Sequence, residues 1–316
     1  MSFAAVMLVA LAIDAALGWP AALFRRIGHP VTWLGRLIAA LDVRLNRGER
    51  SEAARLGAGG VTVALVVAAA ALPALALQAA LPAGWLGIVL GGLLAWPLVA
   101  ARSLHAHVTA VARPLEARDT AGARAAVAMI VGRDPAQLDA SGIGRAALES
   151  LAENASDGVV APLFWGALLG LPGIAGYKAI NTLDSMIGHR TPRHAAFGRV
   201  AARLDDAANL VPARLTGLLI ALACGRPWRT LRVMARDARH HRSPNAGWPE
   251  AAMAGALGLR LSGPRVYADR VADEPWLNAG AADPAPGDVR RGLAVYLRAT
   301  ALAAAALMAL VLAGVG

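Results

Sequence analysis

The sequence predicts an all-helical, multi-pass integral membrane protein, because the chain is unusually apolar and its apolar runs are long enough to cross a bilayer. Hydrophobic residues make up 57% of the 316-residue chain and charged residues 16%, whereas about 25% charged residues is ordinary in soluble domains. Too little polar surface remains to cover a water-soluble globule. A single cysteine, Cys224, excludes a disulfide scaffold. We therefore expect one membrane-embedded domain over residues 1–316.

Four apolar runs predict transmembrane helices, since each reaches the roughly 17 to 25 residues that a bilayer requires. The first run is followed directly by Arg25 and Arg26, which places its N-terminus outside and its other end in the cytoplasm. The second and third runs are joined by the neutral turn Pro82-Ala83-Gly84, which makes them a hairpin with its tip outside. The four expected spans are residues 3–24, 57–81, 85–101 and 293–315.

Arginine-rich stretches separate the spans, and 31 basic against 21 acidic residues leave a net charge of +10. Most of this excess is typical of the cytoplasmic side of a cell inner-membrane protein in contact with lipid. Nucleic acid is a poor partner, because only four Phe and three Tyr are available to stack on bases. The expected cytoplasmic, helical loops are residues 25–56, 102–155 and 225–292.

Two shorter apolar segments are ambiguous. Residues 158–176 contain Pro162 and Pro172, and residues 207–224 contain Pro212. Arginine-rich loops flank both segments, which a simple crossing does not predict. We favour short re-entrant or half-buried helices that begin and end on the cytoplasmic side, where protein must cover their irregular backbone. A pair of ordinary spans is the alternative.

A charged stripe lies on the helix predicted between Ser141, a candidate N-cap, and Gly158, a candidate stop. Its carboxylates repel one another, so a cation or an arginine from elsewhere is needed to neutralise them. A solvated helix face is the alternative, but the stripe leads directly into an apolar segment, where ionisable groups are usually functional. The residues of the stripe recur at every fourth position: Arg145, Glu149, Glu153 and Asp157.

Acidic and amide residues at helical spacing form two further clusters near the membrane boundary. Oxygen ligands on one helix face suit Mg²⁺, and interleaved basic residues suit the phosphates that Mg²⁺ accompanies. We expect an active site of this kind, facing the cytoplasm, within residues 141–214. The oxygen donors are Asn181, Asp184, Asp205, Asp206 and Asn209, and the basic residues among them are Arg145, Lys178, Arg203 and Arg214.

A loop constrained by proline and glycine, SPNAGWPE, groups Ser243, Asn245 and Glu250. Turn chemistry explains its prolines and glycine, and ligand binding would explain its polar side chains. His29, which precedes Pro30, is either a structural residue of a turn or a further substrate contact. The sequence contains no Walker loop, nucleophile elbow or dinucleotide fingerprint.

All the candidate site residues above except Lys178 lie in long contiguous motifs: LAIDAALGWP, HPVTWLGRLI, RAALESLAENASDGVVAPLFWGALLG, NTLDSMIGH, FGRVAARLDDAANLVPARLTG and SPNAGWPEAAMAGALG. These motifs closely resemble the adenosylcobinamide-phosphate synthases of cobalamin biosynthesis, the CobD/CbiB family. The resemblance covers essentially the whole chain. Members of that family are multi-pass membrane proteins, which agrees with the spans expected here.

The resemblance implies an amide-forming reaction. The free propionate carboxylate of adenosylcobyric acid would be joined to the amine of (R)-1-aminopropan-2-ol O-phosphate, or of aminopropanol, giving adenosylcobinamide phosphate. Because amide formation from a carboxylate is uphill in water, we expect ATP to activate the carboxylate and Mg²⁺ to neutralise the phosphates. Other membrane-associated enzymes of the late cobalamin pathway are candidate partners.

On this hypothesis the motif residues divide by role. The metal ligands are Glu153, Asp157, Asp184, Asp205 and Asp206. Phosphate or the activated acyl group is bound by Arg145, Lys178, Arg203 and Arg214, with further substrate contacts from Ser243, Asn245 and His29. The substrate is oriented by Asn154, Asn181 and Asn209, and the general base is Glu153 or Glu250.

Two other functions fit the same residues. A Mg²⁺-dependent intramembrane prenyl- or alcohol-phosphate transferase would also use paired acidic helices. A corrinoid transporter would place broken helices and buried carboxylates at the membrane midplane. Against the transporter, the two halves of the sequence show no matching interrupted segments.

Overall fold

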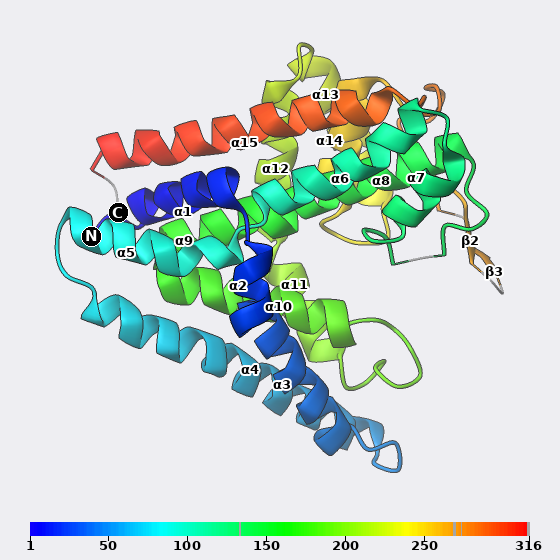
Figure 1. The fold of residues 1–316 in the computed structure, drawn as a ribbon. Coiled ribbons are helices and arrows are strands. Elements are labelled where there is room, and N and C mark those ends of the chain that lie inside the picture. Colours follow the sequence, from blue (N-terminus) through cyan, green and yellow to red (C-terminus); the bar gives the residue numbers. More distant parts are fainter. Residues whose placement is uncertain (133, 268–269, 273, 315–316) are drawn as a thin grey trace. The chain divides into compact units, whose positions relative to one another are not determined.

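The chain forms a mainly helical protein (Figure 1). It divides into two compact units, each built from separate stretches of sequence. A computed structural model describes residues 1–132, 134–267, 270–272 and 274–314. Most of the described residues lie in helices and only ten lie in strands, which fits the helical membrane protein expected from the sequence and adds two small sheets to it. Unit 1 comprises Met1–Ala100, Ala161–Asn209 and Ala306–Gly316, and unit 2 comprises Ala101–Val160 and Leu210–Ala305.

The secondary structure of unit 1 consists of helices alone over its described residues. Its α-helices are α1 (Phe3–Leu17), α2 (Ala21–Ile27), α3 (Pro30–Leu45), α4 (Glu52–Ala80), α5 (Trp85–Ala95), α9 (Ala161–Leu169), α10 (Leu171–Ile187) and α11 (Arg199–Ala208). A short 3₁₀ turn, η1 (Trp96–Leu98), follows α5.

Unit 2 combines helices with two small antiparallel sheets, β1–β4 and β2–β3. The helices are α6 (Ala101–Glu116), α7 (Thr120–Val127), α8 (Ala140–Ala155), the π-helical turn η2 (Ser156–Val160), α12 (Leu210–Ala223), α13 (Pro227–Asp237), η3 (Ala238–His240), α14 (Gly247–Leu257) and α15 (Asp288–Leu312), whose last residues belong to unit 1. The strands are β1 (Leu261–Ser262), β2 (Arg265–Tyr267), β3 (Arg270–Ala272) and β4 (Trp276–Leu277).

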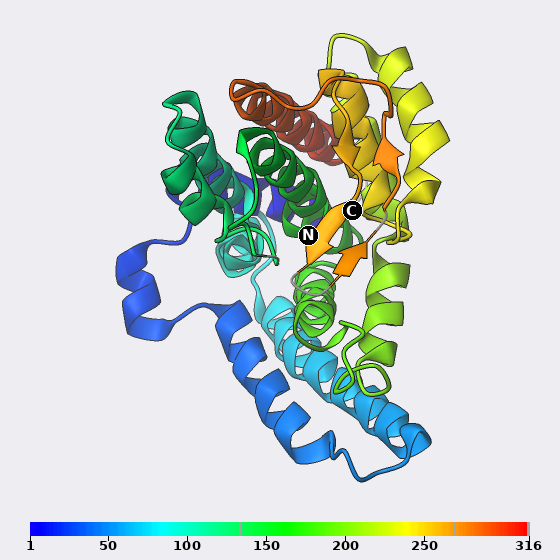
Figure 2. The same ribbon diagram turned by 90° about the vertical axis from the view of Figure 1, so that its right-hand side faces the viewer.

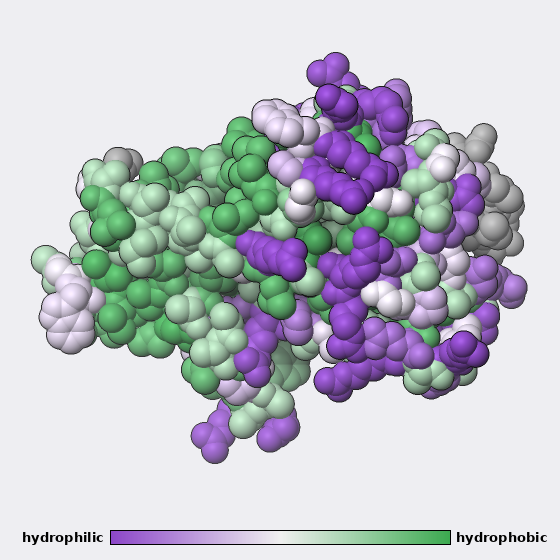
Figure 3. All heavy atoms as spheres, turned by 90° about the horizontal axis from the view of Figure 1, so that it is seen from above, coloured by the Kyte–Doolittle hydropathy of each residue, from purple (hydrophilic) through white to green (hydrophobic). Residues whose placement is uncertain are grey.

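Three helices among the described residues are long and apolar enough to cross a membrane: Glu52–Ala80, Trp85–Glu116 and Asp288–Leu312. The first is α4, the second combines α5, η1 and α6, and the third is α15. They overlap three of the four expected spans. Treating each of two bent helix pairs as one span raises the number to five. Exposed Leu72 and Leu75 on α4 and Leu93 on α5 are suited to lipid contact. In Figure 3, green hydrophobic side chains cover most of the left of the visible face, and purple hydrophilic side chains gather on the right.

The first expected span, residues 3–24, is interrupted. Helix α1 ends at Leu17 because Gly18 adopts a φ of 58°, and the pair formed with Ala21–Leu45 bends by 109°. An indole N–H satisfies the carbonyl at this break, because Trp96 Nε1 donates to Gly18 O at 3.0 Å. A second indole acts at the end of α2, where Trp19 Nε1 donates to Gly28 O at 3.2 Å. Composition alone did not indicate this break.

The ambiguous segment at residues 158–176 is broken where α9 meets α10, at Gly170 with a φ of 70°. The side chain of Gln78 on α4 accepts the N–H of Leu171 at 2.7 Å, which caps the new helix. Pro172 lies in the first turn of α10, where its missing N–H costs nothing. The expectation of short helices interrupted near prolines agrees with this geometry, and whether they cross the membrane stays a prediction.

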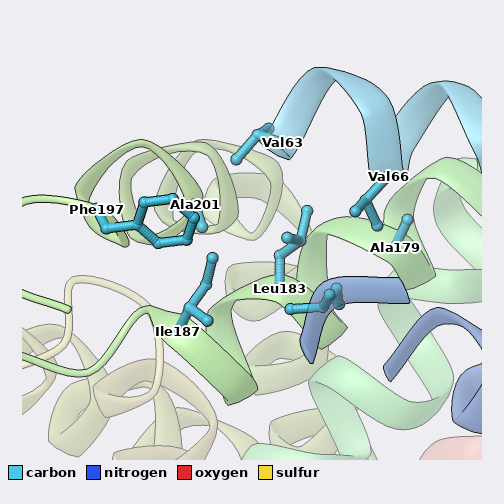
Figure 4. Packing of buried hydrophobic residues seen from close by; sticks show 8 residues of the cluster. Val63, Val66, Ala179, Leu183, Ile187, Phe197 and Ala201 are labelled. Carbon is cyan, nitrogen blue, oxygen red and sulfur yellow. The ribbon is translucent and has the colours of Figure 1, made fainter. Parts of the chain in front are cut away.

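A buried apolar cluster in unit 1 packs α10 against α4 and α11 (Figure 4). Phe197, fully buried just before α11, lies beside Leu183 and Ile187 of α10. Helix α4 approaches this cluster closely, since a Cβ added at Gly59 would lie 1.9 Å from the carbonyl oxygen of Phe197. This packing sets the position of the polar faces of α10 and α11.

In unit 2 both predicted ends of the helix that carries the charged stripe are wrong. Helix α8 is capped by Asp139, whose Oδ1 accepts the N–H of Gly142 at 2.7 Å, so Ser141 lies inside the first turn. The helix does not stop at Gly158 but continues through the π-helical turn η2 into α9. A π turn adds one residue per turn and therefore moves Asp157 off the four-residue stripe.

The segment expected to be a helical loop, residues 225–292, holds both sheets of unit 2. Figure 2 draws the strands in orange; of these, β4 contacts α13, and both β1 and β4 contact α14. Two carboxylates anchor this segment through backbone N–H groups at 2.7 Å: Glu149 Oε1 accepts from Ser262, and Asp237 Oδ2 accepts from Asn278. Both of these donor residues have positive φ, 59° and 57°, which makes a helix impossible there.

Candidate functional site

Unit 1 brings together most of the polar residues that the sequence singled out on α10 and α11. We call this set the α10–α11 cluster. Lys178, Asn181 and Asp184 follow one another at three-residue steps along one face of α10. The full cluster is Lys178, Asn181, Asp184, Asp205, Asp206 and Asn209.

Amide side chains hold the carboxylate of Asp205. Asn209 Nδ2 donates to Asp205 Oδ2 at 3.0 Å, and the side chain of Asn181 on α10 also hydrogen-bonds to Asp205. Tyr177 in turn donates its hydroxyl hydrogen to Asn209 Oδ1 at 2.9 Å. The cluster is therefore an ordered network, in which residues from both helices fix the direction of one carboxylate.

Like charges meet in this network. Asp205 interacts electrostatically with Asp184 and Asp206, and Asp184 interacts with Asp206. Asp184 lies outside the candidate membrane spans. Its burial raises the pKa of Asp184 above the ordinary value of 3.8, the charge of Asp206 raises it further, and that of His189 opposes the rise. Carboxylates gathered against their mutual repulsion are a common arrangement at cation-binding sites.

The donor set suits Mg²⁺ held together with a phosphate group. Mg²⁺ is usually bound by only one or two carboxylates, with phosphate oxygens and water as the other ligands, and Asp184 and Asp205 offer such a pair. Within the described ranges, no group of three or more His, Cys, Asp or Glu side chains has a geometry that would hold a metal ion by itself. The five-carboxylate metal site expected from the sequence stays a prediction.

Basic groups of unit 1 act on Asp206 and on His29. Arg203 and Arg190 interact electrostatically with Asp206, and Lys178 interacts with His29. His29 itself caps α3, because its Nδ1 accepts the N–H of Val31 at 3.2 Å. The ring of His29 lies edge-on to Trp19, with ring centroids 5.0 Å apart. This geometry supports the structural interpretation of His29 and leaves a substrate contact as a prediction.

Helix α8 carries the charged stripe in unit 2, and two of its members have structural partners. Arg145 donates to Asp283 Oδ1 at 2.6 Å and lies 4.6 Å over the ring of Trp276. Glu149 is buried against the backbone of Ser262. Their contacts hold α8 to the segment that contains the sheets, which is a sufficient structural reason for both charges.

The remaining members of the stripe, Glu153 and Asp157, and the neighbouring Asn154 are more accessible. Glu153 and Asn154 lie on the exposed face of α8, and Asp157 is half-buried in η2. Asn154 Nδ2 donates back to Ser150 O at 2.9 Å. These residues belong to unit 2, whereas Asp184, Asp205 and Asp206 belong to unit 1. The residues predicted for the site are therefore divided between the two units.

A second polar cluster in unit 2 gathers around the SPNAGWPE loop, and we call it the α12–α14 cluster. Arg214 of α12 lies 4.4 Å over the ring of Trp248 and donates to Asn245 Oδ1 at 3.4 Å. Asn245 is buried, and the hydroxyl oxygen of Ser243 accepts its N–H at 3.3 Å. The cluster consists of Arg214, His241, Ser243, Asn245, Trp248 and Glu250.

Within this cluster a histidine approaches a buried carboxylate. His241 Nε2 lies 3.6 Å from Glu250 Oε1, and the two side chains are only 4% and 3% exposed. Glu250 is in the first turn of α14, where the helix dipole favours a negative charge. A desolvated carboxylate beside an imidazole is a frequent arrangement for proton transfer.

Sequence reasoning missed four residues that the structure adds to these clusters: His241, Trp248, His189 and Arg190. His241 and Glu250 are separated by a loop, so helical spacing could not relate them. His189 and Arg190 follow NTLDSMIG directly, so the sequence alone could have indicated that these two basic residues lie near the carboxylate of that motif. Trp248 lies in the SPNAGWPE motif itself.

Comparisons with known proteins agree with this architecture over nearly the whole chain. A family model described as "CobD/Cbib protein" matches residues 7–296. A "Cobalamin biosynthesis protein CobD" of Rhodobacter capsulatus is 67% identical over 302 residues, which covers 95% of each chain. Proteins with the same name from Brucella suis and Sinorhizobium fredii are 50% and 46% identical, covering 87% and 97% of this chain and 86% and 96% of theirs. No solved structure matches.

Proposed function

Because the chain belongs to the CobD/CbiB family and therefore takes part in cobalamin biosynthesis, we propose that it forms the amide bond of adenosylcobinamide phosphate. The substrates would be adenosylcobyric acid, through its free propionate carboxylate, and (R)-1-aminopropan-2-ol O-phosphate or aminopropanol. The reaction would take place at the cytoplasmic face of the cell inner membrane, where other late cobalamin-pathway enzymes are candidate partners.

The chemistry requires activation of the carboxylate. A carboxylate oxygen attacks the γ-phosphorus of ATP, and ADP leaves with the electron pair of the broken P–O bond. The amine nitrogen then attacks the carbonyl carbon of the acyl phosphate, inorganic phosphate departs, and the nitrogen loses a proton. This sequence needs a site for several phosphates and a base near the amine.

The observation that carries the proposal is the α10–α11 cluster. Asp184, Asp205 and Asp206 interact with one another electrostatically, although mutual repulsion disfavours this arrangement in the absence of a cation. Arg203 interacts with Asp206 from the same unit. Mg²⁺ bound there would neutralise triphosphate charge, and Lys178 and Arg203 would bind phosphate oxygens.

Of the two candidate bases, Glu250 has the better surroundings. Glu153 is exposed on α8, whereas Glu250 is 2% exposed and lies beside His241. Desolvation makes a carboxylate a stronger base than it is in water. We propose that Glu250 accepts the proton of the attacking amine, and that Arg214, Ser243 and Asn245 bind its phosphate group.

The test is an assay of the purified full-length protein in detergent. Adenosylcobyric acid, aminopropanol phosphate, ATP and Mg²⁺ are supplied, and mass spectrometry follows the corrinoid and the nucleotide. The proposal predicts a corrinoid heavier by the amine less one water, with equimolar ADP. Absence of this product under conditions in which the protein remains folded would overturn it.

The same preparation distinguishes the alternatives. Supplying prenyl diphosphate in place of aminopropanol phosphate would give a prenylated product only if the protein is an intramembrane transferase. Vesicles containing only this protein would accumulate chemically unchanged corrinoid only if it is a transporter. Omission of Mg²⁺, with a chelator present, is expected to stop amide formation.

A further inference from the structure

His241 is a buried ionisable group that the proposed chemistry leaves without a role. Its side chain is 4% exposed, and its Nε2 lies 3.6 Å from Oε1 of Glu250. The neighbouring His240, by contrast, is exposed. Burial of a histidine against a carboxylate is costly unless the pair is fixed by further contacts, so the contacts that hold His241 decide what it can do.

The backbone fixes the protonation pattern of the imidazole. The N–H of Ser243 donates to His241 Nδ1 at 3.1 Å, and a backbone N–H is always a donor. Nδ1 also lies 3.4 Å from the carbonyl oxygen of Ser243, but the contact with the N–H is the shorter one. We therefore assign Nδ1 as the acceptor, which leaves the ring proton on Nε2. The group that faces Glu250 is consequently an N–H donor.

Close packing fixes the position of His241 at its Cβ. A Cβ added at Gly247 would lie 2.6 Å from the Cβ of His241 and 2.3 Å from the carbonyl oxygen of Ala238. The start of α14 is thus pressed against His241, three residues before Glu250. The hydroxyl oxygen of Ser243 also accepts the N–H of Ala246 at 3.2 Å, which fixes the loop that carries the Nδ1 partner.

We propose that His241 is a positioning residue for Glu250: its Nε2–H aims at Oε1 and holds the carboxylate in the direction needed to accept the proton of the amine. The inference rests on the proposed function, because it assigns His241 a part in that reaction. A separation of 3.6 Å is longer than a hydrogen bond, and such contacts often shorten when substrate binds.

Three substitutions separate positioning from simple support of the loop. His241→Gln keeps a donor near the place of Nε2, whereas His241→Asn keeps an acceptor near the place of Nδ1 for the Ser243 N–H. His241→Ala removes both. His240→Gln is the matched control, since it alters the adjacent, exposed imidazole.

The measurements are kcat and KM for amide formation by the full-length protein in detergent, with the apparent melting temperature of each variant. Positioning predicts that His241→Asn lowers kcat by about tenfold to a hundredfold, with KM little changed. His241→Gln retains a donor near the position of Nε2, so its kcat should lie within about threefold of the wild-type value. His240→Gln should match the wild type.

The opposite order, with the Asn variant active and the Gln variant impaired in step with its melting temperature, would show that His241 only supports the loop and would overturn the inference. Equal activity of all three variants would overturn it as well. Failure of the wild-type protein to form the amide would instead overturn the proposed function, so the two failures are distinguishable.

Discussion

Replacement of Asp205 by Asn isolates charge from shape in the α10–α11 cluster. Asparagine has nearly the same volume, and its side-chain oxygen can still accept the Nδ2–H of Asn209, which lies at 3.0 Å in the native protein. The change removes one negative charge that interacts with both Asp184 and Asp206. Asp184→Asn is the equivalent change on α10, and Glu49→Gln, on an exposed residue of the same unit, is the control.

The expected effects on activity and stability have opposite signs. Loss of a carboxylate that binds Mg²⁺-phosphate should lower kcat by about a hundredfold to a thousandfold, or about 2.7 to 4 kcal/mol of transition-state stabilisation. Removing repulsion from Asp184 and Asp206 should stabilise the folded state by on the order of 1 kcal/mol. A structural role for Asp205 would instead link lost activity to lost stability.

Amide formation and thermal unfolding are measured on the same detergent-purified samples. The reasoning predicts that Asp205→Asn and Asp184→Asn are nearly inactive yet melt at or above the wild-type temperature, and that Glu49→Gln is unchanged in both. Full activity of both Asp variants would refute a metal-phosphate role for the cluster. A fall in melting temperature that parallels the loss of activity would refute the charge argument.

Three further predictions concern stability. Gly59→Ala should lower the apparent melting temperature by several degrees, because its Cβ would lie 1.9 Å from Phe197 O; an unchanged value would contradict the packing of α4. Asp139→Ala should cost about 1 kcal/mol, and Ser141→Ala much less, since Asp139 is the cap of α8; thermal melts compare the two. Because the pKa of Asp184 is raised, folding favours its neutral form. Its contribution to the free energy of unfolding is therefore fully present below about pH 4 and is lost as the pH rises through the raised pKa. Melting temperatures measured from below pH 4 upward should fall less steeply for Asp184→Asn than for the wild type.

The membrane-length helices were predictable because hydropathy depends on composition alone. The interruption at Gly18 could not be predicted from composition, because the surrounding residues stay apolar. The indole N–H that satisfies the carbonyl of Gly18 comes from Trp96, far along the chain. The cap of α8 was misassigned because Asp139 and Ser141 are both good capping residues. Only the contact between Asp139 Oδ1 and Gly142 N distinguishes them.

Some contacts of the candidate site could likewise be predicted from the sequence, and others could not. Asn181 and Asp184 share a helix face by spacing, so their proximity could be predicted. The approach of Asp205 to Asp184 depends on how Phe197 packs α11 against α10, which is a tertiary effect. The pairing of His241 with Glu250 depends on a loop that turns back on itself. Periodicity carries no information about either contact.

The most direct test of the proposed reaction follows an oxygen atom. Adenosylcobyric acid labelled with heavy oxygen in its free carboxylate is incubated with the purified protein, aminopropanol phosphate, Mg²⁺ and ATP. Activation through an acyl phosphate predicts that one labelled oxygen appears in inorganic phosphate for each amide formed, while ADP stays unlabelled. Amide formation without label in phosphate, or labelled phosphate without amide, would contradict the account.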